Sequence, residues 1–286
     1  MRNLALMSFV CLVLLLALPT AGNAQPVPVG TGTQRLSLKH ARITVFTYRP
    51  NCHVPSLLLV FHGQNRNAAD YRDWARPLAD QHCMLVVAPE FEKFEFPRWR
   101  YQHGGIAKDG ELQPSSQWTG RLVLALIERI RQLEGRMMTY SLIGHSAGGQ
   151  YLSRLAAFTP TESQRIVIAN PGTHVLPDPR LDAPYGFGGV YPINVMDKEL
   201  RRYLSAPVTI YLGSIDTGDE GLSKSSQAIA QGPTRYARGI NAFEAAQALA
   251  RARGWPFNWR LVEVPGVGHR AKQMFAAQEA SHALKP

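Results

Sequence analysis

The chain has 286 residues, 45% of them hydrophobic, and a formal net charge of +10 from 31 Lys and Arg against 21 Asp and Glu. The apolar fraction is ordinary for a globular protein, and we find no internal repeat, low-complexity tract or linker, which excludes a repeat array. The positive charge has two interpretations, a basic surface that attracts anionic polymers or membrane faces, or solubility charge. We favour solubility charge because the basic residues are scattered and no nucleic-acid motif accompanies them, so we expect no nucleic-acid partner.

The first 24 residues have the pattern of a signal peptide. Arg2 supplies the positive charge, residues 4–18 form an apolar run, and Gly22 and Ala24 are the small residues before a cleavage site. We predict cleavage after Ala24, export to the periplasm or the extracellular space, and no stable membrane insertion afterwards. The alternative is an uncleaved membrane anchor, for which the apolar run is short. Residues 25–39 are expected to be a flexible lead-in, and residues 40–286 a single domain.

Strand-like and helix-like segments alternate along that domain. Strands are expected at residues 41–48, 56–61, 84–88, 137–143, 166–169, 208–212 and 259–264. Helices are expected from about residue 68, where Pro77 divides or kinks the segment, and at residues 119–133, 148–158, 241–252 and 271–284. Residues 90–117 form a loop, and residues 171–206 an irregular insertion with one short helix near 198–203. The alternation predicts a mostly parallel sheet with helices on both faces, whose strands gather chemistry at their carboxyl ends.

The run Gly144-His145-Ser146-Ala147-Gly148 lies between an expected strand and an expected helix. A nucleophilic serine on such a sharp turn needs small residues two positions away, because bulk there would strike the adjoining strand and helix. The amino terminus of the helix also directs free amides at the reacting centre, where negative charge develops. The pattern predicts that Ser146 is a nucleophile. A glycine-rich turn with an idle serine is the alternative.

Acyl transfer also needs hydrogen-bond donors for the carbonyl oxygen of the substrate. One expected donor is the backbone N–H of Ala147, directly after the nucleophile. The other should come from the loop after residues 56–61, which begins His62-Gly63-Gln64-Asn65 and in which Gly63 allows a close backbone approach to a ligand. We assign the second donor to the Gln64 amide, with Asn65 as the alternative.

His269 follows the last expected strand at the end of a glycine-rich approach, Val264-Pro265-Gly266-Val267-Gly268. A general base in that loop can reach a nucleophile at the carboxyl edge of the sheet. We therefore predict that His269 is the base. His145 is expected to point away from the nucleophile, and His62 to be structural.

Asp216 follows the strand expected at residues 208–212 and comes late enough in the chain to orient His269. We predict that it is the acid of a Ser146, Asp216 and His269 triad. The alternative is a solvated loop aspartate, in which case the acid would be one of Asp178, Asp182, Asp219 and Glu220.

Cys52 and Cys83 each lie just before an expected strand, so both should sit at the amino-terminal edge of the sheet. Export would place them in an oxidising compartment. We predict a disulfide between them, which would stabilise the fold by roughly 3–4 kcal/mol in the chain-entropy model. Two buried free thiols are the alternative.

Five segments together resemble the poly(3-hydroxybutyrate) depolymerase and feruloyl esterase-like branch of the α/β-hydrolases. They are Leu59-Val60-Phe61-His62-Gly63-Gln64, Val86-Val87-Ala88-Pro89-Glu90-Phe91, Gly144-His145-Ser146-Ala147-Gly148-Gly149, Gly213-Ser214-Ile215-Asp216 and Gly268-His269. The order of serine, acid and histidine is also that of this superfamily. The resemblance implies an α/β-hydrolase fold with a mostly parallel central sheet and a small loop-rich lid.

The same resemblance implies a serine carboxylic ester hydrolase that works through an acyl-enzyme without a cofactor or metal. Two departures favour small-molecule or oligomeric esters over solid polyester as substrates: the loop after His62-Gly63 has no cysteine, and no residues remain for a polymer-binding domain. Other interpretations are a peptidase or thioesterase on the same triad, and a catalytically silent fold that binds at the cell envelope. Aromatic residues in 94–101 and 185–191 would either cover the pocket or pack onto the rim of the sheet.

Overall fold

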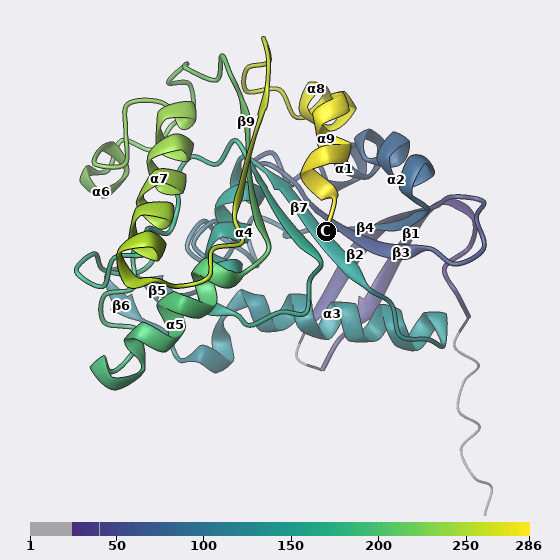
Figure 1. The fold of residues 1–286 in the computed structure, drawn as a ribbon. Helices are drawn as coiled ribbons and strands as arrows, with labels where there is room; N and C mark the ends of the chain where they lie inside the picture. The colour runs from purple at the N-terminus through teal and green to yellow at the C-terminus, as the bar shows by residue number, and fades with distance from the viewer. Residues whose placement is uncertain (1–24, 40) are drawn as a thin grey trace, which may run out of the picture.

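Within residues 25–39 and 41–286, which the computed structural model describes, eight strands form one mixed sheet in the order β1-β2-β4-β3-β7-β8-β9-β10 (Figure 1). β1 pairs antiparallel with β2 and β2 antiparallel with β4, whereas the remaining neighbours are parallel. The strands are β1 Gly30–Ser37, β2 Arg42–Arg49, β3 Ser56–Phe61, β4 Met84–Pro89, β7 Tyr140–His145, β8 Arg165–Ala169, β9 Val208–Gly213 and β10 Arg260–Val264. The predicted signal peptide lies outside the described residues.

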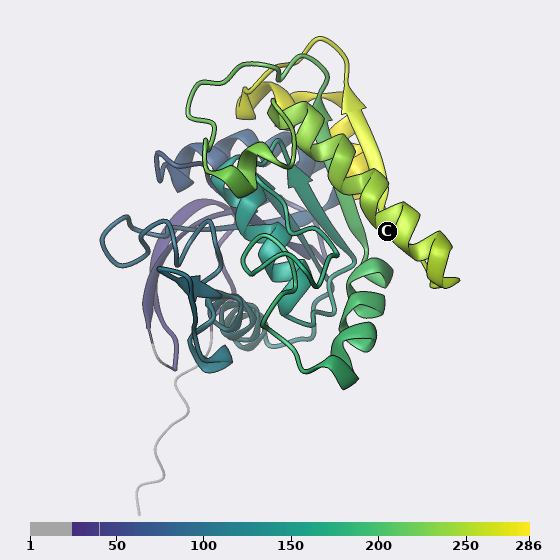
Figure 2. The ribbon, with the colours of Figure 1, turned by 90° about the vertical axis from the view of Figure 1, so that its left-hand side faces the viewer.

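Helices cover both faces of the sheet (Figures 1 and 2). They are α1 Ala68–Trp74, α2 Arg76–His82, α3 Thr119–Glu134, α4 Ala147–Phe158, α5 Ile193–Ser205, α6 Ser226–Ile229, α7 Arg235–Arg253, α8 Ala271–Ala276 and α9 Gln278–Leu284. Apolar residues of α3, α4, α5 and α7 form one core layer, and those of α1, α2, α8 and α9 form the other. This arrangement is the α/β-hydrolase fold class predicted from the sequence.

The buried strands explain why both layers form. Successive side chains of a strand point to opposite faces of the sheet, so an uninterrupted apolar run supplies both cores at once. In β3, Leu57, Leu59 and Phe61 enter the layer beneath α3 and α4, while Leu58 and Val60 enter the opposite layer. All five side chains are fully buried.

The prediction of a flexible lead-in over residues 25–39 is wrong. Residues 30–37 form β1, which pairs along its whole length with β2, and the Val27 amide donates a hydrogen bond to Glu134. The sequence signal was weak because β1 is an edge strand with one exposed polar face. Leu36 and Val27 nevertheless reach the core, which fixes the segment to the domain.

Three helices also differ from their predicted extents. α5 begins five residues before the short helix expected in the insertion, and α7 begins six residues before its expected start. Thr234 caps α7 by accepting a hydrogen bond from the Ala237 amide, a start signal that precedes the apolar pattern used for the prediction. The last helix is divided into α8 and α9 at Ala277, which has an extended backbone.

A disulfide joins Cys52 and Cys83, as predicted from their positions. Cys83 ends α2 and precedes β4, and Cys52 lies four residues before β3. The bond therefore connects the segments that lead into β3 and β4, where the Ser56 amide also donates to the Cys83 carbonyl.

The long loop before α3 contains a small hairpin and a short 3-10 helix. The hairpin pairs β5 Ala107–Lys108 with β6 Glu111–Leu112, and the 3-10 helix is Ser115–Gln117. No helix of the described chain is both long and apolar enough to span a bilayer.

Candidate active site

Ser146 occupies the single-residue turn between β7 and α4. Its backbone has φ 58° and ψ −112°, a conformation that costs energy in a residue with a side chain. Neighbouring glycines make the turn feasible: a Cβ on Gly144 would lie 2.6 Å from the backbone of Gly148, and one on Gly148 would lie 2.3 Å from the carbonyl oxygen of Phe61. The steric requirement predicted for this motif is therefore present, and the turn holds the Ser146 hydroxyl above the sheet.

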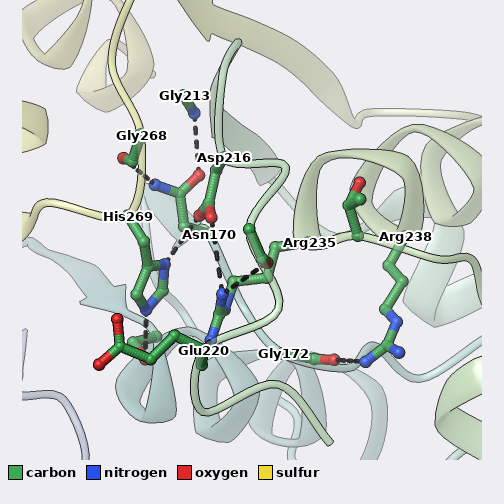
Figure 3. A network of polar contacts seen from close by, with 12 residues as sticks. Asn170, Gly172, Gly213, Asp216, Glu220, Arg235, Arg238, Gly268 and His269 are labelled. Carbon is green, nitrogen blue, oxygen red and sulfur yellow. Dashed lines mark hydrogen bonds and ion pairs between the residues drawn. The ribbon is translucent and has the colours of Figure 1, made fainter. Parts of the chain in front are cut away.

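Ser146, His269 and Asp216 form a continuous chain of hydrogen bonds, of which Figure 3 labels His269 and Asp216. His269 Nε2 lies 3.0 Å from Ser146 Oγ, and His269 Nδ1 lies 2.7 Å from Asp216 Oδ2. Each side chain comes from the carboxyl end of a different strand, since Asp216 follows β9 and His269 follows β10. The Asp216 carboxylate accepts a hydrogen bond from Nδ1–H, which leaves Nε2 without a proton and able to accept that of the serine hydroxyl.

The alternative acids have other surroundings: Asp182 and Glu220 are exposed, and the other two pair with basic side chains. Asp178 pairs with Arg180 at 2.8 Å, and Asp219 pairs with Lys224 at 3.1 Å. By contrast, Asp216 is almost completely buried and has His269 as a direct partner. The structure thus brings together the three residues that the sequence singled out for the triad.

Arg235 lies on the other side of the Asp216 carboxylate. Its guanidinium is 3.6 Å from Asp216 Oδ1 and donates to the backbone carbonyls of Gly218 and Glu220, so the loop after β9 wraps around it (Figure 3). Burial lowers the pKa of Arg235, whereas the nearby negative charge of Asp216 raises it. This first residue of α7 therefore ties the acid to the helix that follows it. Sequence reasoning did not identify it.

Asn170 connects three of the loops around the site. It directly follows β8, accepts a hydrogen bond from the Gly213 amide at 2.8 Å, and donates to the Gly268 carbonyl at 3.4 Å (Figure 3). Its Nδ2 also lies 3.4 Å from His145 Nε2. The residue thereby links the loops that carry Asp216 and His269. A polar residue that ends a buried apolar strand at the carboxyl edge was the available sequence signal, but it was not used.

Two other histidines near the site have structural surroundings, as expected. His62 Nδ1 donates to the Gly63 carbonyl, and its Nε2 accepts from the Phe91 amide at 3.0 Å. His145 points away from the serine hydroxyl towards Tyr71, at 3.3 Å from the phenol oxygen. Burial, reinforced by His269 and Arg235, holds the pKa of His145 well below its ordinary value, so its ring is neutral beside that of His269.

Backbone amides are free on two sides of Ser146. In the described part of the chain, neither the Ala147 nor the Gln64 amide donates a hydrogen bond. Gln64 lines a small cavity of about 200 Å³ together with Ser146 and His269, and a Cβ on Gly63 would lie 3.9 Å from that of Ser146. Asn65 lines the same cavity and its amide is also free. The geometry therefore suits an oxyanion hole, with the second donor in the loop predicted for it.

The aromatic side chains of residues 94–101 and 185–191 lie in different environments. Phe96, Tyr101 and Phe187 are buried in the core, whereas Phe94 is fully exposed. Trp99 and Tyr185 line a second cavity, of about 950 Å³, between the loop before α3 and the insertion before α5. Packing thus accounts for three of these rings, and two others line a cavity.

The described residues contain no group of three or more His, Cys, Asp or Glu side chains placed to hold a metal ion. The donors around Ser146 are a hydroxyl, an imidazole, a carboxylate and backbone amides. Such a set is suited to nucleophilic attack with proton transfer.

Comparison with models of protein families gives no match, and comparison with curated proteins gives none either. Among solved structures, the poly(3-hydroxybutyrate) depolymerase LpqC from Bordetella parapertussis is 35% identical, with a TM-score of 0.81 over 89% of this chain and 92% of that chain. Poly(aspartic acid) hydrolase-1 from Sphingomonas sp. KT-1 is 29% identical, with a TM-score of 0.83 over 90% and 99% of the two chains.

More distant structures share the fold alone. The siderophore hydrolase EstB from Aspergillus nidulans is 15% identical, with a TM-score of 0.52 over 91% of this chain and 97% of that chain. At this identity, the similarity extends to the arrangement of the sheet and helices but not to the substrate.

Proposed function

Because the chain belongs to the poly(3-hydroxybutyrate) depolymerase branch of the α/β-hydrolases and is a hydrolase, we propose that it cleaves carboxylic esters through an acyl-enzyme on Ser146. The observation that carries this proposal is the hydrogen-bond chain from Asp216 through His269 to Ser146 Oγ, on a turn between β7 and α4. The same arrangement of nucleophile, base and orienting acid activates serine in hydrolases of unrelated folds.

Acylation begins when Ser146 Oγ attacks the ester carbonyl carbon and His269 Nε2 takes the hydroxyl proton. The carbonyl oxygen becomes negatively charged, and the free amides of Ala147 and Gln64 donate hydrogen bonds to it. Asp216 stabilises the imidazolium through Nδ1, at 2.7 Å. The bond from carbon to the alcohol oxygen then breaks, and the alcohol leaves with the proton from Nε2.

Deacylation repeats these steps with water. His269 Nε2 removes a proton from a water molecule, whose oxygen attacks the acyl carbon, and the same amides stabilise the second oxyanion. The bond to Ser146 Oγ breaks, and the proton on Nε2 returns to the serine. The products are a carboxylic acid and the free enzyme, so that one water is consumed for each ester cleaved.

Hydroxyalkanoate oligomers and aromatic esters are the substrates we propose. LpqC is named as a poly(3-hydroxybutyrate) depolymerase, which supports a hydroxyalkanoate ester. Trp99 and Tyr185 in the second cavity would suit an aromatic group. The name of poly(aspartic acid) hydrolase-1 supports a second candidate, amide hydrolysis on the same triad, because poly(aspartic acid) is joined by amide bonds.

We also infer that the protein is exported. The Cys52–Cys83 disulfide supports this, because disulfides form and persist in oxidising compartments. Export would place the enzyme in the periplasm or outside the cell, where ester oligomers from a polymer are accessible substrates.

Turnover of an ester panel by wild-type protein and by Ser146→Ala tests the proposed reaction. The panel contains p-nitrophenyl acyl esters, feruloyl esters, 3-hydroxybutyrate oligomers and aspartate oligomers. We expect ester cleavage by the wild type and a loss of about 10³–10⁶-fold in kcat for Ser146→Ala. Ser116→Ala, at an exposed serine in the loop before α3, is the control and should keep full activity. Undiminished esterase activity in Ser146→Ala would refute the assignment, and cleavage of the amide substrates alone would favour the second candidate.

A further inference from the structure

The cavity of about 950 Å³ lies between the loop of residues 97–110 and the insertion before α5, which run beside one another in front of α4 in Figure 2. The two segments touch where the rings of His103 and Tyr185 meet, with centroids 5.7 Å apart. α6 and the residues that follow it supply another wall through Gln227 and Gln231. The acylation and deacylation steps proposed above use none of these residues, although we also propose Tyr185 as a contact for an aromatic substrate group.

A buried cation without a counter-ion lies beneath this cavity. Arg154 of α4 is completely buried, and its guanidinium donates to the carbonyls of Pro184, Gln150 and Thr173 and to the Thr173 hydroxyl. No carboxylate of the described residues lies within ion-pair distance of it. Its guanidinium carbon is 5.6 Å from the ring centre of Tyr185, which lines the cavity. The positive charge is therefore separated from the cavity by a single layer of side chains.

Arg238 is a second buried arginine without a carboxylate partner among the described residues, and it lies behind the cavity wall that contains Gln231. It donates only to backbone carbonyls, those of Gly232, Gly172 and Ser223. It lies close to Gln231, since Asn241 and Arg238 both bind the backbone of residues 231–232. Charges that are buried in a low-dielectric interior are screened weakly, so both guanidiniums contribute a positive potential to the cavity.

Two polar side chains of the cavity walls, one exposed and one with a buried ring nitrogen, are candidate partners for a ligand. Arg98 lines the cavity, is exposed, and donates to the hydroxyl of Ser223 at 3.1 Å. His103 Nε2 is buried without a hydrogen-bond partner. Burial, together with the positive charges of Arg154 and Arg98, lowers the pKa of His103 to about 3, so its ring is neutral.

The acidic residues of the cavity are peripheral. The cavity is lined by four charged residues, all of them solvent-exposed: Arg98, Asp109, Arg180 and Asp182. Exposed charges are screened by water and salt, and these rim charges include both signs. The buried cations are not screened in this way. We therefore expect the two buried guanidiniums to favour an anion at the floor of the cavity.

We propose that this cavity is a subsite for a carboxylate group of the substrate, with Arg98 and His103 as its direct donors. A carboxylate oxygen would satisfy His103 Nε2 and supply the negative charge that Arg154 lacks. Arg154 lies eight residues after Ser146 along α4, which corresponds to about 12 Å of helix. A substrate that reaches both places must span about this distance, as an ester oligomer does, so the structure assigns a preference for ester oligomers with a free terminal carboxylate. This inference rests on the proposed function.

Binding of two matched ligands tests the subsite without turnover. The ligands are the linear trimer of 3-hydroxybutyrate with a free carboxylate and its methyl ester, measured by calorimetry against the Ser146→Ala protein. We expect the free acid to bind about tenfold more tightly than the methyl ester, because a charge-assisted hydrogen bond is lost in the ester. Equal affinities, or no binding of the acid, would overturn the proposal.

Variants in the same Ser146→Ala background locate the effect. Arg98→Gln should abolish the preference for the acid, and His103→Phe, which keeps a ring of similar shape, should reduce it. Arg100→Gln is the matched control, because Arg100 lies two residues away on the same loop and lines a different cavity. If Arg100→Gln removed the preference and Arg98→Gln retained it, the site would be elsewhere and the proposal wrong. Should the acid bind as expected while wild-type protein cleaves no ester, the proposed function would fall and the subsite would stand.

Discussion

Two side chains contact the Asp216 carboxylate, the proposed base His269 and the buried Arg235. His269 donates to one of its oxygens, and Arg235 faces the other from the start of α7. Arg235 also binds the carbonyls of Gly218 and Glu220, so a single guanidinium positions both the carboxylate and its loop. Since a displacement of about 1 Å in an active site costs as much as 10²-fold in rate, this contact should matter for turnover.

We predict that Arg235→Met lowers kcat for p-nitrophenyl butyrate by about 10–100-fold with little change in KM. Arg235→Lys should recover part of the loss, because it keeps the charge but not the forked geometry. Arg238→Met is the matched control: it removes a second buried arginine from the same helix, one that binds backbone carbonyls and no carboxylate. Steady-state kinetics and a melting temperature for each variant separate an effect on catalysis from an effect on stability. Equal losses of kcat in the two Met variants would show that Arg235 acts only through the stability of α7.

The contact between β3 and α4 sets how far Ser146 stands from the sheet. Gly148 is the point of closest approach, since a Cβ there would lie 2.3 Å from the Phe61 carbonyl oxygen and 2.8 Å from its Cβ. These atoms are the backbone and the Cβ of Phe61, so no flexible side chain can move aside. α4 would have to shift away from the sheet to admit even a methyl group.

Gly148→Ala should therefore lower the free energy of unfolding by about 2–4 kcal/mol and greatly reduce activity, through overpacking. Gly218→Ala is the control, because no atom lies within 4 Å of the position its Cβ would take, and its effect should stay below about 1 kcal/mol. Urea denaturation gives both values. A Gly148→Ala protein as stable as the Gly218→Ala protein would disprove the close packing described for the elbow.

The elements that sequence patterns predicted best are those buried on both faces. β3, β4 and β9 are mostly apolar and were placed to within a residue. β1 was missed because its pattern is polar: an edge strand exposes one face, and only Leu36 of this strand reaches the core. α7 was predicted too short because its first turn carries two arginines and its cap, Thr234, lies before the apolar pattern. α5 was predicted too short because it begins after Pro192 without a capping side chain.

Site residues divide in a similar way. Ser146, Asp216 and His269 each follow a predictable strand, so the order of strands alone places them at one edge of the sheet. Arg235 and Asn170 were not found, because their roles depend on contacts between distant segments, such as that between Asn170 and Gly268. Only the folded chain specifies those pairs. The lining of the second cavity depends in the same way on how two long loops meet.

At the scale of the whole molecule, buried neutral histidines make stability depend on pH, and His145 near the active site is one of them. Burial lowers the pKa of His62 to about 4 and the pKa values of His103 and His174 to about 3. An imidazole in the unfolded chain titrates near its ordinary pKa of about 6.5, so below that pH the unfolded state binds protons that the folded state does not. Stability is therefore complete above about pH 6.5 and declines as the pH falls towards the folded values.

The expected decline is about 1 kcal/mol per pH unit for each such histidine between pH 6 and pH 4.5. His174→Phe removes one of them, at a position where Nε2 has no hydrogen-bond partner. The slope of unfolding free energy against pH should become shallower by that amount, as measured by urea denaturation. His53→Phe, at an exposed histidine, should leave the slope unchanged. A slope in His174→Phe equal to that of the wild type would contradict neutral burial of this side chain.

The central claim is that His269 and Asp216 activate Ser146 as a nucleophile. Labelling with a fluorophosphonate, followed by mapping of the modified peptide by mass spectrometry, tests it most directly. We predict a single adduct on Ser146, no label on Ser146→Ala, and labelling slowed by about 10²-fold or more in His269→Ala. An unlabelled wild-type protein, or an adduct that persists in Ser146→Ala, would contradict the account.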